Sequence, residues 1–417
     1  MAESTRVHGD NRLTGGRLSM GAVWLAAWVH GAFSIAAPCS ANGSASVSFR
    51  VTVPADTPKD ARVFIAGNLP ALGGWKADGL RLQRANDGRY QGAVNLPVGS
   101  VIEYKLTRGS WARVEKSANG GDVANRRLRV EKDQAVNVTV ARWAEGGGPD
   151  MVRSSTLTGQ VRTHEEFASR HLKNRRAIAV YLPPDYDARR DRRYPVLYLH
   201  DGQNVFDAAT SFLGVEWQAD EHAERLIKAE RIEPLIIVGV YNNSERTNEY
   251  TPTRDEGRGA GGKAEAYARF LVEEVKPFVD RTYRTKPQRE HTAVAGSSLG
   301  GLVSLYICAE YPQVFSMCGA ISPALTWDEE NWLAAARRDP AWMKGIRFWV
   351  DMGTGEGRQI EGYSRAIEQT RALEKVFDAA GLVPGREYSY EEVAGGEHNE
   401  ASWAARFDRV LLFFFGK

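Results

Sequence analysis

From residue 175 to residue 417, short apolar runs alternate with segments of helical periodicity, and this alternation limits the fold more than any other feature of the sequence. The apolar runs are continuous, which is typical of strands buried on both faces of a sheet. The segments between them repeat apolar residues every three to four positions, as amphipathic helices do. Strands alternating with helices predict an α/β domain with a doubly wound, mostly parallel sheet. The expected strands are 175–186, 194–202, 234–240, 291–295, 315–322, 346–353 and 388–395, and the expected helices are 216–230, 266–283, 302–312, 361–381 and 401–415.

The region before residue 144 has a different pattern. Between Ser46 and Trp143, short segments of alternating apolar and polar residues are separated by turn residues. This pattern predicts a small antiparallel β-sandwich. The sequence AEGGGPD then indicates a flexible connection. We therefore place a β-sandwich domain at 42–143, a glycine-rich linker at 144–154 and the α/β domain at 155–417.

Residues 1–41 have the pattern of a secretory signal peptide. Three arginines precede the uncharged run 18–37, and small residues offer a cleavage site after Ala41. A retained transmembrane anchor is the alternative, but glycine, histidine and serine dilute the run. We therefore expect an exported protein, periplasmic or secreted, without stable membrane insertion after cleavage.

The charge balance bears on the partners. The 54 Lys and Arg against 52 Asp and Glu give a net charge of +2, and neither sign forms a long block, so we expect no nucleic-acid partner. After cleavage only Cys308 and Cys318 remain; they could form a disulfide or serve as buried free thiols. No Cys/His spacing typical of zinc occurs. We expect no metal, and the chemistry inferred below implies no organic cofactor.

A candidate nucleophile lies in the segment Gly296-Ser297-Ser298-Leu299-Gly300. This is a G-x-S-x-G motif between an expected strand and an expected helix, the setting in which a serine stands on a tight turn as a nucleophile. The flanking glycines leave room for backbone strain and for the approach of a base. We therefore assign the nucleophile to Ser298 rather than Ser297.

The base follows from chain order. In hydrolases with this motif the order is serine, acid, histidine, and His398 is the one histidine after Ser298. It lies in a glycine loop before the last expected helix, where the imidazole can reach over the nucleophile. A metal site in the EHNE stretch is disfavoured because neither H-E-x-x-H nor H-x-x-E-H is present.

Two residues compete for the acid that orients the imidazole. Glu356 lies in the loop after the expected strand 346–353, and Asp351 lies inside that strand. Catalytic groups collect at the carboxyl ends of parallel strands, so we favour Glu356 and keep Asp351 as the alternative.

An acyl-transfer site also needs donors for the developing oxyanion. The N–H of Leu299, directly after the nucleophile, is the first candidate. The second is the N–H of Gln203, in the loop after the strand 194–202, where Gly202 permits a turn toward the site. His200 and Asp201 could form a separate catalytic pair, but their position before Ser298 favours a role in the architecture of this loop.

Several motifs in order resemble one family. They include YPVLYLHDGQNVFD, IIVGVYNNSERTNEYTP, AGSSLGGLVSLY, DMGTGE and GGEHNEASWAARF. Over about 155–417 the chain is similar to the esterase D-like family, which includes feruloyl, acetylxylan and trilactone siderophore esterases as well as mycolyltransferases. The resemblance implies an α/β-hydrolase fold and serine esterase activity, with Ser298, His398 and Glu356 as the triad and Leu299 and Gln203 at the oxyanion.

The first domain resembles the family 20 starch-binding carbohydrate-binding module. The motifs are VFIAGNLPALGGW, VNLPVGSVIEYKLTRGSW and NRRLRV. The resemblance implies that Trp75 and Lys105 hold a glycan. The family's second stacking aromatic, shortly before Asn125, is absent, because Trp111 lies too early in the sequence; one stacking face is therefore expected.

These observations predict an exported serine esterase with a starch- or glycan-binding module, which binds an ester substrate and, through the module, a polysaccharide. Two alternatives stay open: an acyltransferase, in which an alcohol replaces water, and a glycan-binding protein with an inactive hydrolase domain. The acyl and alcohol parts of the substrate are not readable, because specificity lies in variable loops.

Overall fold

The computed structural model describes residues 43–417 apart from 119, 121–122, 124, 145–153 and 357–364. The expected signal peptide and most of the expected linker lie outside the described residues. Within the described part of the chain, no helix is both long enough and apolar enough to cross a membrane.

The first domain is built on one seven-stranded sheet. Its neighbouring strands run antiparallel, except that β1 (Ser44–Thr52) pairs with β8 (Gln134–Thr139) in parallel. The order is β7 (Arg126–Arg129), β5 (Val101–Thr107), β2 (Val63–Gly67), β3 (Leu80–Arg84), β4 (Tyr90–Pro97), β1 (Ser44–Thr52) and β8 (Gln134–Thr139), and β6 (Glu115–Lys116) pairs separately with β9 (Arg142–Trp143).

This sheet curls upon itself to enclose a core. Alternate residues of β1 are buried, and the ring of Phe49 on β1 contacts that of Tyr104 on β5 with centroids 5.3 Å apart. The two strands come from opposite halves of the sheet, which are joined through β3. The domain is therefore β-rich, as expected, and its curled sheet is consistent with the expected sandwich.

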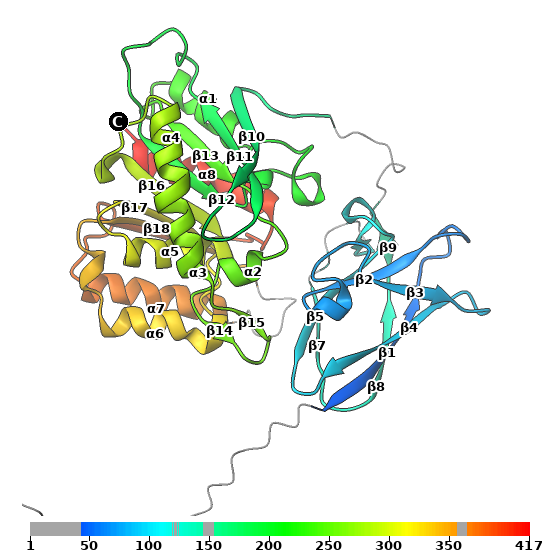
Figure 1. The fold of residues 1–417 in the computed structure, drawn as a ribbon. Coiled ribbons are helices and arrows are strands. Elements are labelled where there is room, and N and C mark those ends of the chain that lie inside the picture. The colour runs from blue at the N-terminus through cyan, green and yellow to red at the C-terminus, as the bar shows by residue number, and fades with distance from the viewer. Residues whose placement is uncertain (1–42, 119, 121–122, 124, 145–153, 357–364) are drawn as a thin grey trace, which may run out of the picture. The chain divides into compact units, whose positions relative to one another are not determined.

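The second domain contains an eight-stranded sheet (Figure 1). Six neighbouring strands, from β13 (Ile236–Val240) to β19 (Tyr388–Val393), run parallel to one another. At the other side of β13, β11 (Arg175–Leu182) and β10 (Gln160–Ala168) each pair with their neighbours in the antiparallel direction. The order is β10 (Gln160–Ala168), β11 (Arg175–Leu182), β13 (Ile236–Val240), β12 (Val196–His200), β16 (Thr292–Ser297), β17 (Met317–Ile321), β18 (Arg347–Gly353) and β19 (Tyr388–Val393). Strand β10 was not expected from the sequence, because it is an edge strand without a fully buried face.

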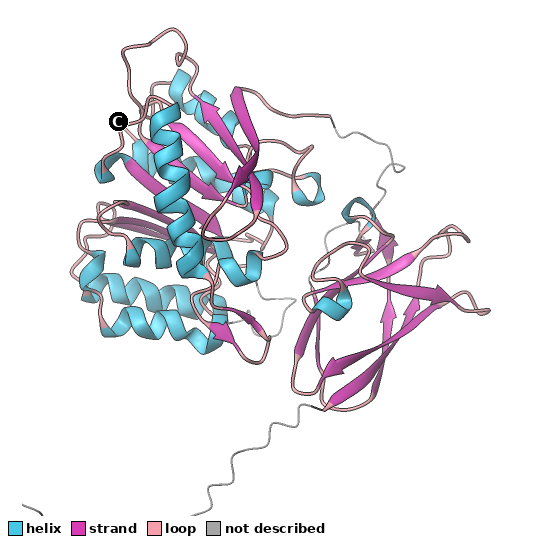
Figure 2. Cartoon of the chain, viewed as in Figure 1, coloured by secondary structure: helices cyan, strands magenta, loops and turns pink. Residues whose placement is uncertain are grey.

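Helices cover both faces of this sheet (Figure 2). Along β11, Ile178 and Val180 belong to one apolar cluster, and Ala179 and Tyr181 belong to the other. The second cluster is closed by α1 (Ala219–Lys228) and α8 (Glu400–Phe415). The first is closed by α3 (Ala264–Arg269), a π-helical turn (Phe270–Val275), α4 (Lys276–Thr282), α5 (Leu299–Glu310), α6 (Asn331–Arg338) and α7 (Ala366–Ala379). This is the doubly wound α/β arrangement, with a mostly parallel sheet, that the alternating pattern predicted.

The two cysteines lie inside this domain, Cys308 on α5 and Cys318 on β17, and both are buried free thiols. Because β12, β16, β17 and β18 are parallel, their carboxyl ends meet at one edge of the sheet. The segments that follow these ends build the site.

Candidate active site

Ser298 occupies the sharp turn between β16 and α5. Its backbone has φ 57° and ψ −122°, a conformation that few side chains adopt and that costs on the order of 1–3 kcal/mol. The neighbouring glycines are required, since a Cβ on Gly296 would lie 2.8 Å from the carbonyl carbon of Gly300. Ser297, in contrast, is buried at the end of β16. The turn therefore presents the hydroxyl of Ser298.

His398 connects this serine to a carboxylate. It lies in the loop between β19 and α8, with Nε2 2.9 Å from Ser298 Oγ and Nδ1 2.7 Å from Glu356 Oε2. The ring of Trp403 packs edge-on against the imidazole, with centroids 5.0 Å apart. Serine, histidine and glutamate thus form one hydrogen-bonded chain, which is the geometry of a nucleophile, a base and an orienting acid.

Glu356 is held as an anion. Its side chain has no exposed surface, and its second oxygen, Oε1, accepts hydrogen bonds from the Gly353 N–H at 3.0 Å and the Ser322 hydroxyl at 2.5 Å. Burial alone would raise the pKa of Glu356, but the hydrogen bonds from His398, Ser322 and Gly353 keep it below its ordinary value. A carboxylate that stays ionised can stabilise the imidazolium formed during catalysis.

Asp351, the alternative acid, has other partners. It is fully buried inside β18 and accepts hydrogen bonds from Arg406 Nε at 3.1 Å, Arg406 Nη2 at 2.9 Å and Trp349 Nε1 at 2.7 Å. Burial raises the pKa of Asp351, while Arg406 and Trp349 act in the opposite direction. The structure therefore brings Glu356, and not Asp351, to the imidazole.

The two candidate donors to the oxyanion are the N–H groups of Leu299 and Gln203, which follow the adjacent parallel strands β16 and β12. Leu299 is the first residue of α5, so its N–H has no acceptor within the helix. Gln203 lies in a 3₁₀ turn (Gly202–Asn204) after β12, and its side-chain oxygen accepts a hydrogen bond from the Asn242 N–H at 3.2 Å. A Cβ on Gly202 would lie 2.3 Å from the backbone of Gly239, so only glycine fits there.

His200 and Asp201 support this loop. His200 is buried, its Nδ1 lies 2.8 Å from the Tyr267 hydroxyl, and burial lowers its pKa to about 3. Asp201 forms a two-point ion pair with Arg246, at 2.7 Å to Nε and 2.8 Å to Nη2. Burial would raise the pKa of Asp201, but Arg246 and Asn242 hold it below its ordinary value. Neither group is hydrogen-bonded to the Ser298 chain, which agrees with an architectural role.

The first domain brings together two tryptophans that lie far apart in the sequence. Trp75 and Trp111 have ring centroids 6.4 Å apart and planes inclined at 38°. Trp75 stands on a turn with φ 65°, and Trp111 begins a 3₁₀ turn after β5. Trp111, which lies too early in the sequence to match the family's second aromatic, thus lies beside Trp75 in the structure.

Lys105, the other predicted glycan contact, is buried. It is 8% exposed, and its Nζ donates a hydrogen bond to the Val123 carbonyl. The structure thus places the Lys105 ammonium against the backbone of its own domain.

Three carboxylates gather where α1 begins. Glu216, Asp220 and Glu221 each offer an oxygen within 4.8 Å of the others, the one such acidic or histidine group in the described residues. Glu216 accepts a hydrogen bond from Thr156 Oγ1 at 2.6 Å, and Asp220 accepts one from the Thr158 N–H at 2.8 Å. These bonds give the group a structural role, which is to anchor the segment 154–158, and we assign no metal to it.

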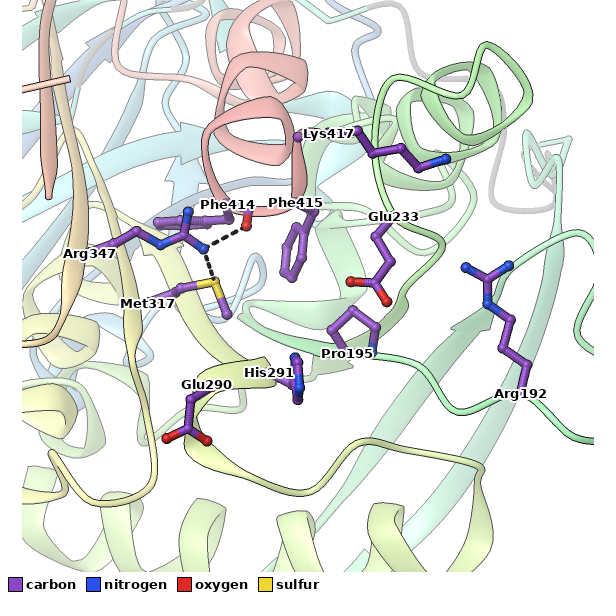
Figure 3. A pocket seen from close by; sticks show the side chains of 11 residues that line it. Arg192, Pro195, Glu233, Glu290, His291, Met317, Arg347, Phe414, Phe415 and Lys417 are labelled. Atoms are coloured by element: carbon purple, nitrogen blue, oxygen red, sulfur yellow. Dashed lines mark hydrogen bonds between the residues drawn. The ribbon is translucent and has the colours of Figure 1, made fainter. Parts of the chain in front are cut away.

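A cavity of about 480 Å³ opens at the other edge of the sheet (Figure 3). Met317 and Arg347, which line it, are the first residues of β17 and β18, so the cavity lies at the amino ends of the strands. The guanidinium of Arg347 donates to the Phe414 carbonyl at 2.7 Å and contacts Met317 Sδ at 3.1 Å. The strands thus separate this cavity from Ser298.

Comparison with known proteins identifies the family. The family described as "Putative esterase" matches residues 169–414, more than half of the chain. The chain belongs to this esterase family. A second family, described as "Starch binding domain", matches residues 44–140 of the same esterase.

The esterase also resembles individual proteins. It is 31% identical over 241 residues to the endo-1,4-beta-xylanase/feruloyl esterase of Xylanibacter ruminicola, an alignment of 57% of this chain and 29% of the relative. It is 45% identical over 103 residues to an alpha-amylase of Niallia circulans, 24% of this chain and 8% of the relative. This chain therefore spans less than a third of either relative.

Among solved structures, the enterochelin esterase of Shigella flexneri has a TM-score of 0.50 at 14% identity and covers 88% of this chain and 91% of its own. At that identity the likeness concerns the fold alone.

Proposed function

We propose that this protein is a serine esterase that hydrolyses carboxylic esters through an acyl-enzyme. The observation that carries the proposal is the position of His398, which bridges Ser298 Oγ and the Glu356 carboxylate. Ser298 Oγ attacks the ester carbonyl while Nε2 takes its proton. The same proton then goes to the leaving alcohol, and the serine keeps the acyl group.

Hydrolysis completes the cycle. His398 takes a proton from water as the water oxygen attacks the acyl carbonyl, and returning that proton to Ser298 Oγ releases the carboxylic acid. The N–H groups of Leu299 and Gln203 donate to the oxyanion in both halves of the reaction. Glu356 holds the imidazole in the required tautomer and balances its positive charge.

The proposed substrate is an ester linked to carbohydrate, and the enzyme acts after export. The support is the starch-binding family match of the first domain, the Trp75–Trp111 pair and a relative whose name joins a xylanase to a feruloyl esterase. In this proposal the module holds the enzyme on a polysaccharide and takes no part in the chemistry.

A hydrolysis screen of the purified chain from residue 42 tests the proposal. The substrates are acetylated xylan, methyl ferulate, a ferric triscatecholate lactone and short nitrophenyl esters, with the Ser298→Ala variant as the control. We expect turnover of at least one ester class by the wild type alone. Transfer of the acyl group to an added alcohol in preference to water would replace hydrolase by acyltransferase, and absence of all turnover would contradict both activities.

A further inference from the structure

Behind Glu356 lies a buried group of polar side chains that the reaction described above does not use. Ser322, Asp351, Trp403 and Arg406, which we call the support cluster, are each less than a tenth exposed. Ser322 follows the carboxyl end of β17, Asp351 lies in β18, and the other two residues project from α8. The cluster therefore ties the acid of the triad to three separate elements.

Ser322 is the member of the cluster that is hydrogen-bonded to Glu356. Its hydroxyl donates to Glu356 Oε1 at 2.5 Å and accepts hydrogen bonds from Trp403 Nε1 at 3.1 Å and Arg406 Nη2 at 2.7 Å. These two donors occupy the acceptor positions of the hydroxyl, so its one proton must point to Glu356. Oε1 is thereby fixed, and Oε2 is the oxygen left to face His398. Ser322 has φ 44°, so the fold keeps a serine at a position that strains its backbone.

Arg406 and Asp351 form the charged part of the cluster. Arg406 Nη2 lies 2.9 Å from Asp351 Oδ1 and 3.6 Å from Glu356 Oε1. The pairing of Arg406 with Glu356 is the longer of the two, and without Asp351 the buried cation would act on Glu356 alone of these two acids and cancel the negative charge that the imidazolium needs. Asp351, which has no bond to His398, neutralises Arg406 and so leaves the negative charge of Glu356 available to His398.

From this geometry we propose that Ser322 and Asp351 are positioning residues of the esterase: Ser322 fixes the Glu356 carboxylate, and Asp351 neutralises Arg406 so that Glu356 acts on His398. The proposal rests on the proposed function. Of the two acids considered for the triad, Glu356 then orients His398 and Asp351 neutralises Arg406.

The first test uses Ser322→Gly and Ser322→Ala with a nitrophenyl ester. Both variants remove the hydroxyl, but glycine accepts the positive φ and alanine does not. If the hydroxyl matters, kcat falls in both by a similar factor, roughly 10- to 100-fold for a lost hydrogen bond to a charged group, while KM changes by less than about twofold. The matched control is Ser316→Ala, which removes a hydroxyl bonded to the Arg289 carbonyl next to the amino end of β17.

The second test is the pH profile of kcat/KM for Asp351→Asn. This variant leaves Arg406 uncompensated, and its positive charge repels a second positive charge on the nearby imidazole. The acid limb should therefore move to lower pH, by roughly one unit for an extra charge at this range, and the plateau should fall. In Asp351→Asn with Arg406→Met both charges are gone, and the limb should return to its wild-type position.

The outcomes separate the two proposals. Activity of Ser298→Ala like that of the wild type would contradict the proposed function itself. An inactive Ser298→Ala together with wild-type kcat in both Ser322 variants would overturn the positioning role alone. A loss of kcat in Ser322→Ala that Ser322→Gly restores would also overturn it, since backbone strain would then be the cause. If Asp351→Asn does not fold, the Ser322 pair still decides.

Discussion

At the scale of single residues, the site depends on backbone positions that the fold holds under strain. Ser298 and Ser322 both have positive φ, and both follow the carboxyl ends of neighbouring strands, β16 and β17. Their hydroxyls lie at the two ends of one hydrogen-bonded chain that runs through His398 and Glu356. The ends of the strands therefore place the two serines, whereas His398 and Glu356 lie in the segments that follow β19 and β18.

Replacing Ser298 by alanine should abolish ester hydrolysis and leave the fold intact, because one hydroxyl is lost from a partly exposed turn. We expect a fall in kcat of about a thousandfold or more, and a similar fall for His398→Ala, since nucleophile and base act as a unit. Nitrophenyl ester turnover measures both. Ser297→Ala is the matched control and should stay active; the reverse pattern would move the nucleophile to Ser297.

Glu356→Gln should also lower kcat, again by about a thousandfold or more, because an amide neither fixes the required tautomer nor balances the imidazolium. The effect should exceed that of Asp351→Asn, whose side chain has no bond to His398. Steady-state kinetics at the wild-type pH optimum decide the comparison. A larger loss of kcat in folded Asp351→Asn would make Asp351 the acid of the triad.

At the scale of elements, the start of α1 links pH to stability. Asp220 Oδ1 and Glu221 Oε2 are buried without a hydrogen-bond donor in the described structure, and burial together with the contact to Asp220 raises the pKa of Glu221 to about 8. The ordinary value is 4.5. Between these two values the folded chain holds a proton that the unfolded chain releases.

Stability should therefore decrease as pH rises from about 4.5 to about 8, the window set by the two pKa values of Glu221. Glu221→Gln cannot ionise and should flatten this dependence. Melting temperatures measured between pH 5 and pH 9 test the expectation, with Glu230→Gln, an exposed residue shortly after the same helix, as the control. Parallel curves for wild type and Glu221→Gln would remove Glu221 as the cause.

At the scale of the whole molecule, one chain combines two domains. The first carries the Trp75–Trp111 pair, and the second carries the candidate active site at Ser298. In the proposed function the Trp75–Trp111 pair is the contact surface for the sugar, because aromatic faces suit that contact. The Lys105 ammonium is bonded to the Val123 carbonyl, so we expect the rings to carry most of the affinity.

Trp75→Ala should weaken retention of the full chain on amylose or β-cyclodextrin by roughly tenfold, the scale of one lost aromatic contact. The turnover of short nitrophenyl esters should not change, because the module takes no part in the chemistry. Affinity electrophoresis in amylose gels measures the first quantity. Val98→Ala, at an exposed apolar residue of the same domain, is the control. Equal retention of wild type and Trp75→Ala would make Trp75 a structural residue.

The sequence by itself determined the elements and the order of the chemical groups. Short continuous apolar runs such as β13 and β16, alternating with amphipathic helices, are typical of strands buried on both faces, so the parallel sheet followed from local pattern. The G-x-S-x-G motif then placed Ser298 at the carboxyl end of a strand, and chain order left His398 as the base.

Only the tertiary structure decided which acid reaches the imidazole. Side chains alternate along β18, so Asp351 lies on the same face as Trp349, toward α8, and meets Arg406 there. Glu356 lies beyond the end of that strand, where its side chain can turn along the sheet edge to His398. The Trp75–Trp111 pair depended on folding in the same way, since turns bring together residues that a spacing rule keeps apart. Local sequence sets the direction of each side chain on its own element, but contacts between elements exist only once the sheet and the helices have packed together.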